Sequence, residues 1–211
     1  MDLYRGSLIM KNTLVISAYT CCGKTYASEH MKDYDILDVN FCSFKTIRRL
    51  PNEKEIEEER KRWKSSSHLT PVEAYLKQFK QQIINLDNPD FPNNYINYIK
   101  ENIGKVDVII VDSDIKVRQL LNEAKIKFVT VYPWSSCLQE WIGRMYLCDY
   151  SDFIIRNRIN GWHHEMKYKE PLGDKLIKLS YGEYINEKLI EKCFSLGYGM
   201  NGGIEHESNS K

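Results

Sequence analysis

The residues best suited to do chemistry lie near the start of the chain, in the run VISAYTCCGKTYAS that spans residues 15–28. Here Gly23, Lys24 and Thr25 follow an apolar segment, in the order that a phosphate-binding loop uses. Glycine lets the backbone approach a phosphate where a Cβ would not fit. The lysine supplies a point charge to the phosphates, and the threonine hydroxyl is a ligand for Mg²⁺. We therefore predict a loop that binds ATP and Mg²⁺.

The predicted loop departs from the usual pattern at its first position, where Ala18 replaces glycine. Alanine costs little there if its φ stays negative. Cys21 and Cys22 read as small loop residues, although a reactive, low-pKa thiol is the alternative. A Gly-Lys-Thr triplet alone is common, so the prediction depends on the buried strand before it and the helix after it. The predicted ATP-binding residues are Ala18, Tyr19, Thr20, Cys21, Cys22, Gly23, Lys24 and Thr25.

Two acidic residues end apolar segments further along the chain. Asp38 belongs to the predicted strand 34–39, where a carboxylate either orients the phosphate acceptor or caps a turn. Asp112 follows the apolar run 106–111 and is predicted, with Thr25, to hold the metal. Asp114 is predicted to cap the next helix.

Three arginines, Arg144, Arg156 and Arg158, lie in or just after helices that follow the fourth predicted strand. Arginines in a lid neutralise charge that develops on a transferred phosphoryl group. Each taken alone is more often a surface residue, but we predict that at least one of the three is functional. Lys24 and Asp38 complete the predicted catalytic set.

Short apolar runs alternate with helical patterns and predict an α/β protein with helices on both faces of a five-stranded parallel sheet. The predicted strands are 13–17, 34–39, 106–111, 127–132 and 176–179. Ligands in such sheets bind beyond the carboxyl ends of the strands. The loop at 18–25, Asp38 and Asp112 all fall at such ends, so they are expected to converge.

The expected organisation is a single domain over residues 1–199, followed by a disordered tail at 200–211. Two helical insertions are predicted within it. The first, at about 46–88, is highly charged, with an exposed helix after Thr46 and an amphipathic helix from Val72 to Ile83. The second, at about 137–168, is the predicted lid.

The composition of the chain limits which kinds of partner we expect. The chain of 211 residues carries 30 basic and 29 acidic side chains, a net charge of +1. This balance disfavours nucleic acid as a partner without excluding a local basic patch. No apolar stretch approaches the length of a membrane helix, and six cysteines without a paired framework read as reduced thiols. We expect a soluble, cytoplasmic protein that acts on a nucleotide and does not bind membranes; the oligomeric state is left open.

The chain resembles the P-loop nucleoside- and nucleotide-kinase class, and more narrowly a group of small P-loop proteins frequent in bacteriophages and their hosts. The resemblance rests on AYTCCGKT, on residues 88–111 and 117–133, and on Arg144. It implies a three-layer P-loop NTPase fold, ATP use, and a location in the host cytoplasm if a phage encodes the chain. The chain departs from these relatives at Ala18, at positions 112 and 114, where they more often carry Ser and His, and at Cys148, where a second lid arginine is expected.

Three functions are compatible with these features. The leading hypothesis is phosphoryl transfer from ATP to a deoxynucleoside monophosphate. A second places the acceptor hydroxyl on nucleic acid, as in polynucleotide or modified-base kinases. A third is a non-catalytic nucleotide-binding module, which Ala18 and Cys148 favour.

Overall fold

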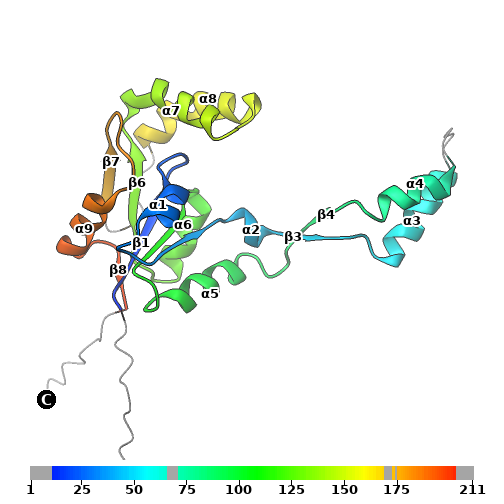
Figure 1. Cartoon of the computed structure of the whole chain (residues 1–211), viewed down its shortest axis with the longest axis horizontal. Helices are drawn as coiled ribbons and strands as arrows, with labels where there is room; N and C mark the ends of the chain where they lie inside the picture. Colours follow the sequence, from blue (N-terminus) through cyan, green and yellow to red (C-terminus); the bar gives the residue numbers. More distant parts are fainter. Residues whose placement is uncertain (1–10, 66–70, 169–172, 174, 203–211) are drawn as a thin grey trace, which may run out of the picture. The chain divides into compact units, whose positions relative to one another are not determined.

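The computed structural model describes residues 11–65, 71–168, 173 and 175–202. The chain divides into two compact units (Figure 1). The main unit comprises Met1–Phe41 and Tyr95–Lys211, and the inserted unit comprises Cys42–Asn94. The two units are described separately below. The expectation of one domain with insertions at about 46–88 and 137–168 stays a prediction.

The main unit is an α/β structure built on a mostly parallel sheet with the strand order β2-β5-β1-β6-β7. The strands are β1 (Thr13–Ala18), β2 (Ile36–Val39), β5 (Val108–Asp112), β6 (Val129–Pro133), β7 (Lys175–Leu179) and β8 (Met200–Asn201). The first five are parallel, whereas β8 pairs antiparallel with the start of β1. The five parallel strands predicted from the sequence are confirmed, and the unpredicted β8 makes the sheet six-stranded.

The central strands are buried and mainly apolar because helices cover both faces of a parallel sheet. Leu14, Val15 and Ile16 of β1 are fully buried, as is the run from Val108 to Val111 in β5. Alternation of apolar and polar residues is therefore absent from these strands. Their continuous apolar runs are the pattern that the sequence showed.

Helices flank this sheet (Figure 1). The helices are α1 (Lys24–His30), α5 (Asn93–Asn102), α6 (Ile115–Glu123), α7 (Leu138–Leu147), α8 (Asp152–Tyr168) and α9 (Glu187–Leu196), with a short 3₁₀ turn η1 (Ser135–Cys137) before α7. The side chain of Asp114 accepts from the backbone N–H of Lys116, so the predicted cap of α6 is confirmed. Asn186 caps α9 in the same way.

The edge of the sheet toward which successive strands are added changes at β1. From β1 the chain passes over β5 to reach β2, whereas from β5 it passes over β1 to reach β6. Because such crossovers are right-handed, α1 and α6 belong to opposite faces of the sheet. Open α/β sheets bind ligands at this kind of switch point, outside the carboxyl ends of the strands.

The inserted unit contains a two-stranded ribbon and a helical pair. Its elements are α2 (Cys42–Lys45), β3 (Thr46–Arg49), α3 (Glu53–Lys64), α4 (Val72–Phe79) and β4 (Ile84–Asp87). Asn52 and Glu55 form a capping box at the start of α3. The rings of Trp63 and Tyr75 stack at 3.8 Å between centroids and hold α3 against α4.

Three expectations from the sequence are wrong at this level. Thr46–Arg49 was expected to begin a helix but is a strand, because it pairs antiparallel with Ile84–Asp87. Ile83 was expected on the amphipathic helix, but that helix ends at Phe79 and Ile83 lies beyond it. Met200 and Asn201 were expected in a disordered tail but pair with β1; residues 203–211 lie outside the described residues. Across the described ranges, no helix combines the length and apolarity needed to cross a membrane.

Candidate functional site

The loop at 18–25 leaves β1 at the carboxyl edge of the sheet. Ala18 is the last residue of β1, is 1% exposed, and lies in register with Asp112 and Val131. Its φ is not positive, because the non-glycine residues with positive φ in the described chain are Cys21, Lys125 and Asp149. Alanine is therefore unstrained at this position, as the sequence led us to expect.

Gly23 is the loop residue whose replacement by another amino acid would strain the backbone. Its φ is +91°, which favours glycine. A Cβ built there would lie 3.2 Å from Cδ1 of Tyr184. The ring of Tyr184 therefore packs directly against the backbone just before Lys24.

Most backbone N–H groups of the loop are available to a ligand. Within the described residues, no hydrogen bond from the backbone N–H of Thr20, Cys21, Gly23, Lys24 or Thr25 is found. The N–H of Cys22 instead donates to Tyr19 at 3.3 Å. Neighbouring N–H groups without partners form a concave surface that suits an anion.

A cation, a hydroxyl and two carboxylates surround the start of α1. The Nζ of Lys24 forms an ion pair with Oδ1 of Asp112. Oδ2 of Asp112 accepts the backbone N–H of Phe41 at 3.0 Å. The Thr25 hydroxyl donates to Oδ2 of Asp38 at 3.1 Å. Asp38 and Asp112, which end neighbouring strands, thus reach adjacent residues of one helix.

The pKa of Asp38 is raised above its usual value, mainly by burial and also by the negative charge of Asp112. Lys24 and the hydrogen bond from Thr25 oppose this shift. A carboxylate with a raised pKa is a stronger proton acceptor than an ordinary aspartate.

The oxygens of Thr25, Asp38 and Asp112 match the ligand chemistry of Mg²⁺, which takes one or two carboxylates and completes its shell with waters and substrate phosphates. In the part of the chain that the structure describes, no group of three or more His, Cys, Asp or Glu side chains gathers as a metal cage. Thr25, Asp38 and Asp112 are therefore the oxygen donors of this site that could hold a Mg²⁺ ion. The sequence predicted Thr25 and Asp112 as ligands, and the geometry adds Asp38.

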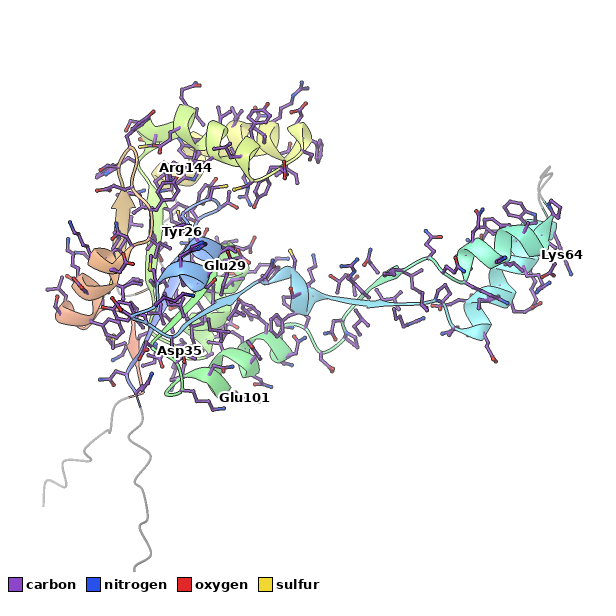
Figure 2. The ribbon with its side chains drawn as sticks, in the orientation of Figure 1. Tyr26, Glu29, Asp35, Lys64, Glu101 and Arg144 are labelled. Carbon is purple, nitrogen blue, oxygen red and sulfur yellow. The ribbon has the colours of Figure 1, made fainter. Side chains whose placement is uncertain are left out.

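A cavity of about 880 Å³ opens beside the loop. Its lining includes Thr20, Cys21, Gly23, Lys24 and Thr25 from the loop. The opposite side comes from α7 and its C-terminal end, and from the segment between β7 and α9. Figure 2 labels two of the lining residues, Arg144 on α7 and Tyr26 on α1.

Arg144 forms part of the cavity wall and is only 4% exposed. Its guanidinium lies over the rings of Trp141 and Tyr184, at 3.9 and 3.6 Å from their centroids. All three of its nitrogens donate hydrogen bonds. Their acceptors are Oε1 of Glu140, the Cys21 carbonyl at 3.3 Å and the Glu183 carbonyl at 2.9 Å. Arg144 therefore joins α7 to the 18–25 loop and to the segment after β7.

The lining of the cavity does not include the remaining predicted residues, which are Ala18, Tyr19, Cys22, Asp38, Asp112, Arg156 and Arg158. Arg156 is exposed on α8. Arg158 is partly buried and lies 5.6 Å from the ring centroid of Tyr19. Of the eight loop residues, Ala18, Tyr19 and Cys22 are core residues with 1%, 1% and 0% exposure. The backbone N–H groups of Tyr19 and Cys22 donate to the carbonyls of Val131 and Tyr19.

Sequence reasoning missed the segment that follows β7. Tyr184 packs on Gly23, and Ile185 donates its backbone N–H to the Cys22 carbonyl at 2.9 Å. No motif marks this segment. The signal that could have found it is the rule that ligands bind at strand carboxyl ends, since this segment leaves the same edge of the sheet as the other site segments.

Comparison with known proteins adds no relative. No family model matches the chain, and no curated protein matches it. The fold and site therefore define the chain as an α/β protein with a mostly parallel sheet and a polar cluster at its carboxyl edge.

Proposed function

We propose that the chain is an ATP-dependent phosphotransferase that acts on a nucleotide. The acceptor that we propose first is a (deoxy)nucleoside monophosphate. The observation that carries the proposal is the meeting of Lys24, Thr25, Asp38 and Asp112 beside the unpaired N–H groups of the loop. This set lies at the switch point of the sheet, and two of its members, Lys24 and Thr25, line a cavity of about 880 Å³.

The loop residues would bind the phosphates of ATP. The free N–H groups and Lys24 supply positive charge to the phosphate oxygens, and the Lys24–Asp112 ion pair opens when the lysine turns to its ligand. Because the side chain of Lys24 is only 16% exposed, this charge acts with little screening by water.

The carboxylates would divide two tasks. Thr25 and Asp112 would hold Mg²⁺, with Asp38 as a further oxygen ligand. Bound Mg²⁺ would neutralise charge on the phosphate oxygens during transfer. Asp38 orients the acceptor, and its raised pKa suits it to take a proton if the acceptor is a hydroxyl.

The state of Arg144 favours a second candidate, a nucleotide-binding module without catalysis. Every nitrogen of this guanidinium already has an acceptor in the protein. An arginine held in this way stabilises a cavity wall rather than a transferred phosphoryl group. Arg156 and Arg158 are the remaining candidates for the lid.

The test is ATP consumption with Mg²⁺ against nucleoside monophosphates, nucleosides and 5′-hydroxyl oligonucleotides. Lys24→Ala should lower turnover about 100-fold or more, as removal of one transition-state donor does. Lys32→Ala is the matched control, since its ammonium is exposed and donates only to the Glu29 carbonyl; its turnover should stay unchanged. ATP binding without turnover on any acceptor would refute the kinase and support the binding module.

A further inference from the structure

Two cysteines that are far apart in the sequence meet at the wall of the cavity. Cys21 belongs to the 18–25 loop, and Cys148 follows the last residue of α7. Both line the same cavity. The Cys148 thiol lies close enough to Cys21 to act on it through a hydrogen bond between the side chains.

The backbones of both cysteines are held in place. The N–H of Cys148 donates to the carbonyls of Arg144 and Met145, at 3.0 and 3.2 Å. Arg144 in turn donates to the carbonyl of Cys21. Trp141 donates its ring N–H to the Thr20 carbonyl at 2.8 Å. Two side chains of α7 therefore fasten this helix to the loop, at Thr20 and at Cys21 itself.

The other cysteines do not offer such a pair. Cys22 is fully buried, and its thiol lies near the Val131 carbonyl rather than in the cavity. Cys137 and Cys193 are also buried, while Cys42 is exposed and belongs to the inserted unit. Of the six thiols, only Cys21 and Cys148 line the cavity.

We propose that Cys21 and Cys148 form a redox-modification site, in which a disulfide between them fixes the end of α7 on the loop and closes the cavity to its ligand. The oxidant is a peroxide. That the occupant is ATP rests on the proposed function, whereas the formation of the disulfide does not.

The chemistry begins at Cys148, because its side chain is exposed and reaches the oxidant. Its sulfur attacks one peroxide oxygen, the O–O bond breaks, and the products are a Cys148 sulfenic acid and one water. The sulfur of Cys21 then attacks the Cys148 sulfur. The S–O bond breaks, the thiol proton leaves with the hydroxide as a second water, and two electrons have passed from the thiols to the peroxide.

The environment of Cys21 supports this order of events. Burial, with the neighbouring Cys148 thiol, raises the pKa of Cys21 to about 12. A thiol with so high a pKa is a poor first target for peroxide. The same high pKa leaves little thiolate for the second step, so Cys21 acts as the resolving partner through its position beside the Cys148 sulfur and not through its reactivity.

The experiment treats the full chain with hydrogen peroxide, blocks the remaining thiols, and maps cross-linked peptides by mass spectrometry. We expect a Cys21–Cys148 disulfide that dithiothreitol removes. Cys148→Ser should abolish it, and Cys42→Ser, which changes an exposed thiol outside the main unit, should leave it intact. Cross-linking of Cys21 to Cys22, or over-oxidation of Cys148 without any cross-link, would overturn the proposal.

The second readout is ATP affinity before oxidation, after it, and after reduction. We expect oxidation to weaken ATP binding at least tenfold in the native chain and not in Cys148→Ser. Full ATP binding by the cross-linked chain would overturn the claim that the disulfide closes the cavity. If the reduced chain binds no ATP while the disulfide still forms, the proposed function fails and the modification site stands.

Discussion

The contact between Arg144 and Glu140 offers the sharpest test of how the cavity wall is held. The side chains are only 5% and 13% exposed, so this is a buried ion pair and not a surface one. Removing one partner of a buried pair costs about 3–5 kcal/mol, because the other charge loses its compensation. In Arg144→Met, Glu140 keeps the N–H of Gly182 at 3.0 Å. We therefore expect the lower end, about 3 kcal/mol.

That loss corresponds to a fall in Tm of about 6–12 °C for a chain of this size. The assay is urea unfolding of Arg144→Met, Glu140→Met and the double variant. Because the residues share one network, the double variant should lose at least about 1 kcal/mol less than the sum of the two single losses.

Lys11→Met serves as the control within the same unit. Its ion pair with Asp107 has side chains 47% and 27% exposed, so the expected loss is below about 1 kcal/mol. If Arg144→Met is no more destabilising than Lys11→Met, the reasoning about the buried wall is refuted.

Three further predictions follow from single contacts. Gly23→Ala should cost about 1–2 kcal/mol of unfolding free energy, because φ is +91°; Gly143→Ala, with open space at its Cβ, should cost nothing, and equal losses would contradict this. Asp38→Asn should raise Tm at pH 8 but not at pH 3.5. A folded pKa raised by burial makes the ionised form unfavourable only at higher pH; a gain at low pH would argue against it. The carboxyl of Glu55, whose pKa the hydrogen bond from Arg49 lowers to about 2, should stay ionised at pH 3 by NMR and become protonated there in Arg49→Met; protonation in the native chain would disprove it.

The main sheet could be predicted because its strands are buried on both faces. A continuous apolar run such as Val108–Val111 indicates burial on both faces from its composition alone. Asp38 and Asp112 could be placed together because each lies near the carboxyl end of a strand, and the carboxyl ends of parallel strands meet at one edge of the sheet.

The missed strands depend on pairing rather than on composition. β3 and β4 are mostly exposed and polar, and each becomes a strand only through its antiparallel partner some 40 residues away along the chain, as Ile47 pairs with Leu86. Met200 and Asn201 likewise form a strand of only two half-buried residues. They are a strand because they pair with Thr13 and Leu14 at the start of β1.

The site was predicted where a local motif exists and missed where contacts cross the fold. Lys24 and Thr25 follow from the loop pattern. The packing of Tyr184 on Gly23 and the engagement of Arg144 depend on segments that meet only in the folded chain. For that reason Arg144 was predicted as a lid residue, while the structure gives it a place in the cavity wall.

The central position of β1 has a consequence for the synthesis of the chain. This strand leaves the ribosome before the other strands of its sheet, and its partners lie far downstream; Ser17 and Asp112, for example, are 95 residues apart. At about 5–20 residues per second, translation leaves β1 without a neighbour for roughly 5–20 s. During that time its apolar residues have no sheet to cover them. The nascent chain should therefore engage chaperones early, and release from them should follow the emergence of β5 and β6.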